Sequence, residues 1–265
     1  MAGAERAVEI ASGIAGTLAL PRGDGPHPCV VLLHGFGGHR DEKGDLFGKL
    51  ASRLAADGIA SLRFDFPGCG KSRGEFGDAT AGLYRRAAIA AMRYARSAPG
   101  MRPERLGLLG YSFGGAIAAA CLSGDAPRTR ALALWAPVGE PSADMLETLG
   151  ADRAAEAERA GAVSVPWGKG EIRLKRAFFQ SLGELKPLEG VARYEGAFLV
   201  VAGSTDRLAK HVAPLHDAAA KASPRAQRII DGADPFVGAA ERRSPHVETL
   251  LAETAAFFAA ALKAK

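Results

Sequence analysis

The chain has 265 residues, of which 48% are hydrophobic and 24% are charged, a composition typical of a globular domain of ordinary size. The net charge is +5, but basic and acidic residues are interspersed, as in residues 40–43 and 241–243. This indicates a solvated surface and excludes a nucleic-acid-binding stripe. Apolar runs stay shorter than the roughly 18 residues that span a bilayer, and the first residues lack the apolar core of a signal peptide. We therefore expect a cytoplasmic protein without membrane contact.

Apolar runs alternate with segments of helical periodicity, which predicts a doubly wound, mostly parallel sheet in one α/β domain over residues 1–265. The strands are expected at Val8–Ser12, Gly16–Leu20, Cys29–Leu33, Ile59–Phe66, Leu106–Leu109, Ala131–Trp135, Phe198–Ala202 and Gln227–Ile230. Helices are expected at Leu46–Ala56, at Thr80–Ser97 and from Ser244, as the N-cap, to Ala264. The alternation breaks between the sixth and seventh strands, where charged helical stretches and a short extended piece occupy residues 139–185.

The segment Leu106–Ala116 contains an apolar strand, the sequence Gly-Tyr-Ser-Phe-Gly and a helix of small residues. In such a Gly-x-Ser-x-Gly elbow, the serine sits on a strained turn between strand and helix, and the glycines avoid steric clashes. The turn exposes the serine hydroxyl over the edge of the sheet, and the helix N-terminus supplies backbone N–H donors. We therefore predict that Ser112 is a catalytic nucleophile.

Further motifs precede and follow this elbow. They are His34-Gly35-Phe36, Arg63-Phe64-Asp65-Phe66, Pro187-Leu188-Glu189 and Gly203-x-x-Asp206. Together with the elbow, they resemble the α/β-hydrolase superfamily, and most closely its bacterial cinnamoyl/feruloyl esterase-type carboxylesterases. The motifs occur in family order over nearly the whole chain. The resemblance implies an α/β-hydrolase fold with an eight-stranded, mostly parallel sheet.

The resemblance also implies that residues 139–185 are a cap inserted over the active site. We expect Ser112 at the bottom of the largest pocket, with the apolar side chains of the cap lining that pocket from above. These side chains are Met145, Leu146, Val163, Val165, Trp167, Phe178, Phe179 and Leu182. A solvated connector with its own small packing cluster is the alternative interpretation.

Acyl transfer needs oxyanion donors, a base and an acid that orients the base. The resemblance implies that the backbone N–H groups of Phe36 and Phe113 are the oxyanion donors. It also implies that Asp206 is the orienting acid, although an aspartate that only caps the following helix would fit the same position. His34 is expected to brace the oxyanion loop through hydrogen bonds, and Asp65 is expected to be structural.

The expected catalytic histidine is absent. The family pattern is Gly-Ala-Asp-His-x-Phe-x-Gly, whereas residues 232–238 read Gly-Ala-Asp-Pro-Phe-Val-Gly, as though a histidine were missing between Asp234 and Pro235. His246 lies further along, and a connection of that length spans at most about 35 Å, so its imidazole could reach back into the site. The other histidines that we consider, with less support, are His39, His211 and His216.

Two functions of different classes remain open. The first is a serine hydrolase acting on an ester, thioester or related acyl group of a small hydrophobic or aromatic molecule. The second is a protein of the same fold that lacks the triad base and either binds a small molecule, catalyses a non-hydrolytic step or is an inactivated variant. Neither needs a cofactor or a metal, and we allow for a homodimer. The cysteines lack metal-binding spacing and are expected to be reduced packing thiols, at Cys29, Cys69 and Cys121.

Overall fold

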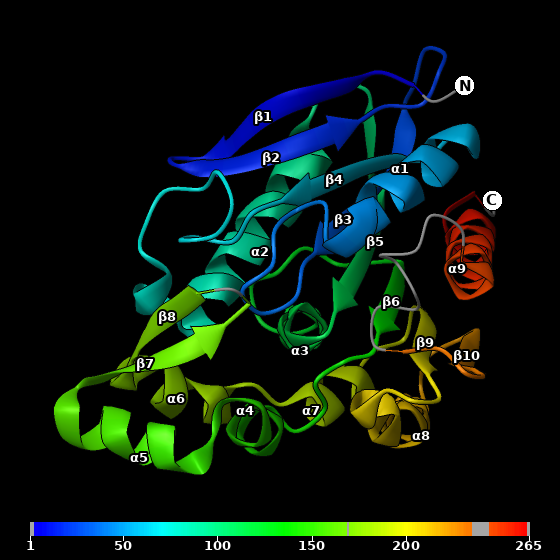
Figure 1. The fold of residues 1–265 in the computed structure, drawn as a ribbon. Helices are drawn as coiled ribbons and strands as arrows, with labels where there is room; N and C mark the ends of the chain where they lie inside the picture. The colour runs from blue at the N-terminus through cyan, green and yellow to red at the C-terminus, as the bar shows by residue number, and fades with distance from the viewer. Residues whose placement is uncertain (1–2, 169, 235–243, 264–265) are drawn as a thin grey trace.

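A computed structural model of the chain describes residues 3–168, 170–234 and 244–263. Within these ranges the main sheet has eight strands, in the order β1-β2-β4-β3-β5-β6-β9-β10 (Figure 1). Their bounds are β1 Glu5–Ala11, β2 Ile14–Ala19, β3 His27–Leu33, β4 Ala60–Phe64, β5 Met101–Tyr111, β6 Ala131–Trp135, β9 Ala197–Gly203 and β10 Arg225–Ile230. Strand β2 pairs antiparallel with β1 and β4, and the remaining pairs are parallel. The predicted α/β-hydrolase architecture is confirmed.

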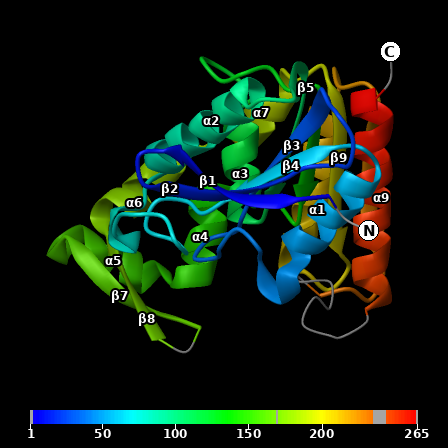
Figure 2. The same ribbon diagram turned by 90° about the horizontal axis from the view of Figure 1, so that it is seen from above.

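Helices cover both faces of the sheet, as Figures 1 and 2 show. One face carries α1 (Leu46–Ala56) and α9 (Pro245–Lys263), which pack against each other. The other face carries α2 (Ala81–Ser97), α3 (Phe113–Ala120), α7 (Pro187–Ala192) and α8 (Val212–Ala218). Parallel strands covered on both sides must be apolar throughout, and β3, β6 and β9 are buried along almost their whole length.

Local sequence signals explain where several helices begin. The Thr80 side chain accepts the backbone N–H of Leu83 and so caps α2, and the Ser244 hydroxyl accepts the N–H of Val247 at the start of α9. Helix α9 was expected to run to Ala264, and the structure describes it to Lys263. Among the described residues, no helix is both long and apolar enough to cross a bilayer.

Residues 141–184, the part of the β6–β9 connection that precedes α7, form a separate group of elements beyond the carboxyl ends of the central strands (Figure 1). These elements are α4 (Pro141–Leu149), α5 (Ala151–Ala160), the β7–β8 hairpin (Ala162–Trp167 and Gly170–Lys175), α6 (Arg176–Ser181) and the 3-10 turn η3 (Leu182–Glu184). Most of its apolar side chains are buried in packing, and the rings of Trp167 and Phe178 lie 5.0 and 5.1 Å from that of Phe36. The inserted segment is therefore packed onto the loop that follows β3.

Candidate active site

Ser112 occupies the turn between β5 and α3 in a strained conformation, with φ 52° and ψ −119°. Its backbone N–H donates to the Trp135 carbonyl at 2.9 Å, and its own carbonyl accepts the N–H groups of Gly115 and Val138. These bonds join the turn to the end of β6 and hold the strained conformation. The Ser112 side chain is half-buried, and its hydroxyl makes no hydrogen bond to any described residue. The hydroxyl is therefore available to a ligand.

Two glycines make this turn sterically feasible. A Cβ added at Gly110 would lie 2.3 Å from the Gly114 carbonyl oxygen. A Cβ at Gly114 would lie 2.4 Å from the carbonyl oxygens of both Leu33 and His34, because the first turn of α3 packs directly on the end of β3. Any side chain at either position would push the serine turn away from the sheet.

The loop after β3 approaches Ser112 closely. A Cβ added at Gly35 would lie 3.4 Å from the Ser112 Cβ, and the rings of Phe36 and Phe113 are 5.9 Å apart. The backbone N–H groups of Phe36 and Phe113 have no acceptor among the described residues. The structure thus brings together the predicted nucleophile, Ser112, and the two predicted oxyanion donors, Phe36 and Phe113. They lie on the adjacent turns that follow β3 and β5.

His34 has a structural role, as expected. Its Nε2 accepts the backbone N–H of Phe66 at 3.0 Å, so the proton of the neutral ring is on Nδ1, which donates to the Gly35 carbonyl at 2.8 Å. Burial lowers the pKa of His34 to about 4. The ring is therefore neutral near pH 7 and both of its nitrogens are engaged by backbone groups.

Asp65, also expected to be structural, is almost fully buried at the end of β4. Its carboxylate accepts the backbone N–H groups of Arg40 and Lys71, at 2.7 and 2.8 Å. Its backbone carbonyl accepts the Ser72 hydroxyl. These bonds connect the end of β4 to the loops on both sides of it.

Asp206 follows β9 and is 5% exposed. Its Oδ1 accepts the backbone N–H of Leu208 at 2.8 Å, so the residue does cap the 3-10 turn η4 (Arg207–His211). Its Oδ2 is buried and has no hydrogen-bond partner among the described residues. Burial raises the pKa of Asp206, and the neighbouring Asp234 carboxylate adds to that rise. One oxygen of this carboxylate is thus unused by the fold.

The histidines occupy different places. His246 is half-buried at the start of α9, where its Cε1 and Nε2 lie 3.8 Å from the position that a Cβ on Gly232 would take. It makes no hydrogen bond to any described residue. His211 lies 2.8 Å from Oδ2 of Asp144 in α4, His216 bonds Asp217, and His39 is exposed. Residues 235–238, where the family pattern would have its histidine, lie outside the described residues.

The interpretation of residues 40–43 as solvated surface is wrong for two of them. Arg40 and Glu42 are 8% and 7% exposed, because the chain folds back there onto the loop that follows β3. Glu42 Oε1 accepts the backbone N–H of Gly35 at 2.6 Å, and burial raises its pKa. The sequence feature that could have indicated this burial is the short, glycine-rich connection that starts at Gly35, because it brings Arg40 and Glu42 back onto the loop.

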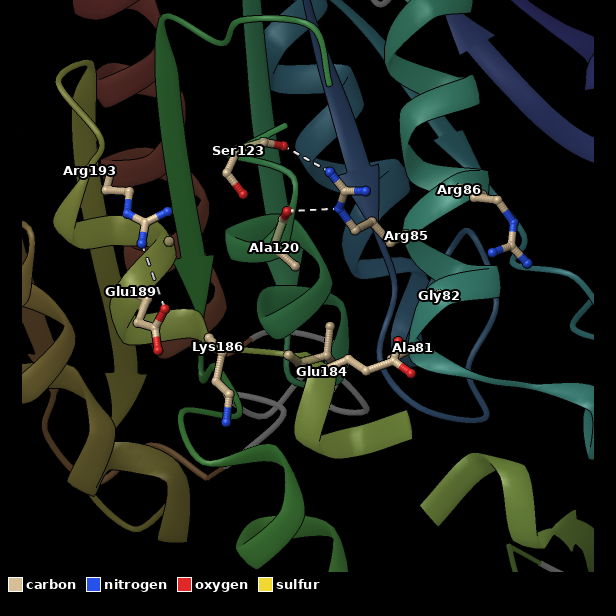
Figure 3. Close-up of a pocket in the computed structure, with 12 residues that line it drawn as sticks. Ala81, Gly82, Arg85, Arg86, Ala120, Ser123, Glu184, Lys186, Glu189 and Arg193 are labelled. Atoms are coloured by element: carbon tan, nitrogen blue, oxygen red, sulfur yellow. Dashed lines mark hydrogen bonds and ion pairs between the residues drawn. The ribbon is translucent and has the colours of Figure 1, made fainter. Parts of the chain in front are cut away.

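Five cavities formed by described residues lie away from Ser112, which lines none of them. The expectation that Ser112 lies at the bottom of the largest pocket is not met among them. One, of about 560 Å³, opens between α2, the end of α3 and α7. Figure 3 shows charged side chains of both signs around it, with Arg85 donating to the carbonyls of Ala120 and Ser123. The Arg85 guanidinium thus caps the carboxyl end of α3 by satisfying carbonyl groups there.

Curated relatives match part of the chain. An uncharacterized 31.7 kDa protein from the traX-finO intergenic region of Escherichia coli is 33% identical over 107 residues, 40% of this chain and 36% of that protein. Esterase FrsA from Klebsiella pneumoniae (strain 342) is 30% identical over 128 residues, 48% of this chain and 29% of FrsA. The chain thus spans about a third of the length of the curated relatives that it matches.

Solved structures resemble the fold over nearly its whole length. Est1E from Butyrivibrio proteoclasticus, in a structure with ferulic acid bound, superposes with a TM-score of 0.74 at 20% identity, covering 98% of this chain and 100% of Est1E. Among protein families, the one described as serine aminopeptidase, S33, matches residues 24–178, more than half of the chain and including both the oxyanion loop and the Ser112 elbow. The chain therefore belongs to the serine aminopeptidase S33 family of α/β hydrolases.

Proposed function

We propose that the protein is a serine-type acyl hydrolase that cleaves an ester, thioester or related acyl group of a small hydrophobic or aromatic molecule. The observation that carries this proposal is the Ser112 turn. A serine held at φ 52°, with its hydroxyl unbonded among the described residues, lies against a loop whose Phe36 N–H has no protein acceptor there. Backbone strain of this kind persists where it serves a function.

In this reaction the Ser112 oxygen attacks the acyl carbon, and the carbonyl oxygen acquires negative charge. The N–H groups of Phe36 and Phe113 stabilise that charge, a contribution worth about 10²–10³ in rate for one such donor. The C–O or C–S bond to the leaving group then breaks, and the leaving group takes up the proton released by Ser112. Water subsequently cleaves the acyl-serine ester and regenerates the hydroxyl.

His246 is our candidate for the base that carries this proton, with Asp206 as the acid that orients it. His246 lies beside Gly232, and the next residue, Ala233, accepts the N–H of Thr205 at 3.1 Å. This hydrogen bond joins the loop after β9, which carries Asp206, to the loop after β10. The imidazole of His246 therefore lies beside two loops that are bonded to each other. The free Oδ2 of Asp206 supports this assignment, because an orienting acid must have an oxygen available to the imidazole.

The preference for aromatic or hydrophobic acyl groups rests on the side chains around the oxyanion loop. The rings of Phe76, Phe113, Trp167 and Phe178 all lie within 6 Å of Phe36, centroid to centroid. We propose that residues 139–185 act as a cap on this side of the site. The ferulic acid in the Est1E structure is an aromatic acid, which is in keeping with this substrate class.

The proposal is tested with p-nitrophenyl acetate and a fluorophosphonate probe. We expect the probe to label the wild-type protein on Ser112 and the ester to be hydrolysed, and we expect both signals to be lost in Ser112→Ala. Ser123→Ala is the matched control, since Ser123 is exposed and outside the proposed site. Labelling that persists in Ser112→Ala would overturn the proposal.

A second function has one observation in its favour. Among the described residues, no imidazole is hydrogen-bonded to Ser112 or to Asp206, and Oδ2 of Asp206 has no partner. A protein without a working base would bind a small molecule in this site or catalyse a non-hydrolytic step. It would show turnover near background and slow labelling, with only the residual acceleration of about 10³–10⁴ over water that the oxyanion hole and binding provide.

A further inference from the structure

We propose that Glu42 is a positioning residue that clamps the His34–Gly35 peptide and thereby helps to set the direction of the next peptide, which carries the Phe36 oxyanion donor. This inference rests on the proposed function and adds a residue to it. Glu42 contributes an acceptor from outside the two turns that carry Ser112 and the oxyanion donors. It comes from the segment that leads into α1, seven positions after the glycine it contacts.

The contact is short and enclosed. Glu42 Oε1 accepts the Gly35 N–H at 2.6 Å, and the residue is 7% exposed. Glu42 itself has a φ of 58° and a ψ of 173°, a backbone conformation adopted almost exclusively by glycine. A strained backbone and a desolvated carboxylate both cost free energy, so the fold tolerates two unfavourable features to place this acceptor.

The other side of Gly35 is held as well. Its carbonyl accepts Nδ1–H of His34 at 2.8 Å and the backbone N–H of Gly38 at 3.2 Å. That carbonyl belongs to the same planar peptide as the Phe36 N–H, and in a trans peptide the two groups point in opposite directions. Fixing the carbonyl of Gly35 therefore fixes the Phe36 N–H.

Glycine is the residue that most needs such restraint, because it rotates freely about both backbone bonds. Glu42 fixes the peptide before Gly35 and His34 fixes the peptide after it, which leaves the glycine little freedom. The space is also full: a Cβ at Gly35 would contact Tyr111, Ser112 and the Glu42 carboxylate, at 3.3–3.5 Å. Movement of Glu42 would therefore release the loop directly beside the nucleophile.

The role depends on an acceptor oxygen and does not need the negative charge. A negative charge near the oxyanion hole opposes the charge that develops on the substrate, so a neutral acceptor of the same shape should serve at least as well. Glu42→Gln keeps a carbonyl oxygen for the Gly35 N–H, whereas Glu42→Ala removes it and leaves a buried donor unpaired. The two variants therefore separate the hydrogen bond from the charge.

The test compares Glu42→Ala, Glu42→Gln and the control Glu75→Ala, an exposed glutamate outside the site. With p-nitrophenyl acetate we expect Glu42→Ala to lower kcat by about 10²-fold, the lower end of the effect of losing an oxyanion donor, with KM changed less than about threefold. We expect Glu42→Gln to recover kcat to within about threefold of wild type. Equal losses in both variants, or no loss in Glu42→Ala, would overturn the proposal.

Amide hydrogen exchange measures the clamp without turnover. We expect the Gly35 N–H to be protected in the wild type and in Glu42→Gln, and to exchange rapidly in Glu42→Ala. Rapid exchange in the wild type would overturn the clamp. If Ser112 of the wild type is not labelled by the fluorophosphonate, the proposed function fails, and the exchange pattern still decides whether Glu42 holds Gly35.

Discussion

His34 accepts the backbone N–H of Phe66 through Nε2, at 3.0 Å, and so joins the loops that follow the neighbouring strands β3 and β4. A protonated ring has no acceptor nitrogen, so protonation of His34 would break this bond. Because burial lowers the pKa of His34 to about 4, the folded protein resists that protonation. The contact therefore links the stability of the fold to pH.

The first prediction concerns this link. Between about pH 6.5 and pH 4 the unfolded chain binds a proton at His34 and the folded chain does not, so the free energy of unfolding falls as the pH is lowered. A shift of this size corresponds to about 3 kcal/mol. Urea denaturation at a series of pH values should show that His34→Asn lacks this component, whereas His27→Asn keeps the wild-type slope. An unchanged slope in His34→Asn would contradict the assignment.

A second prediction restores the family spacing. Inserting a histidine between Asp234 and Pro235 should provide an imidazole N–H that donates to the unused Oδ2 of Asp206. This hydrogen bond would fix the tautomer of the inserted imidazole. If no histidine of the chain serves as the base, esterase activity should rise by at least about 10²-fold, the lower range for a positioned general base, and if His246 is the base no gain is expected. Insertion of alanine at the same point is the control and should give no gain. A folded histidine variant without any gain would show that the base is supplied elsewhere.

The third prediction concerns His246. If His246 is the base, His246→Ala should lower the rate of p-nitrophenyl acetate hydrolysis by at least about 10²-fold. His216→Ala, which alters a histidine in α8 bonded to Asp217, should leave the rate unchanged. A His246→Ala variant with wild-type activity would instead support a chain without a triad base.

A fourth prediction concerns the contact between the inserted segment and the loop after Asp206. Asp144 of α4 is fully buried and bonds His211 and Lys210, and these hydrogen bonds hold its pKa at about 2 despite the opposing effect of burial. We expect Asp144→Ala to lower the free energy of unfolding by about 3 kcal/mol, as for a broken buried pair. Glu147→Ala is the matched control. Glu147 lies in α4 like Asp144 and forms ion pairs with Arg207 and Lys210, but its side chain is half-exposed. This substitution should lower the free energy of unfolding by less than about 1 kcal/mol.

The same pair has a pH signature. Because the folded pKa of Asp144 is depressed, its contribution to stability is complete above the ordinary carboxyl range and is lost as the pH falls toward about 2. Acid titration followed by circular dichroism should therefore show that Asp144→Ala removes part of the acid-induced loss of stability. If the two acid transitions superpose, the pair contributes nothing to the fold.

The fold could be predicted from sequence where apolar pattern and local signals agree. Helix α1 and strand β6 have the bounds expected from periodicity, since both are bordered by clear turn residues. Strand β5 begins at Met101, five residues before the expected start at Leu106. The extension escapes prediction because Arg102, Pro103 and Glu104 are exposed and interrupt the apolar run. A method that recognises buried strands by apolar runs cannot detect such an extension.

The site was only partly predictable, for a similar reason. The Ser112 turn and the approach of Phe36 follow from short-range steric rules that glycine spacing reveals. Glu42 was missed because its burial depends on how the chain returns under the loop, and a charged residue among other charges carries no local sign of that. The identity of the base depends on the three-dimensional path between Asp234 and Ser244, which residue types alone do not determine.

Trp167, the last residue of β7 in the β7–β8 hairpin, packs on the loop after β3, where its ring lies 5.0 Å from that of Phe36. A Cβ at Gly37 would lie 2.4 Å from the indole Nε1. The two positions therefore cannot vary independently: a side chain at 37 would meet the indole of Trp167 and would also be strained by the φ of +64° at this position. If residues 139–185 are the proposed cap and Phe36 is the proposed oxyanion donor, exchange of the hairpin in evolution or by design would alter substrate preference and donor geometry together. Sequence changes in residues 162–175 are thus constrained by a turn more than a hundred positions earlier.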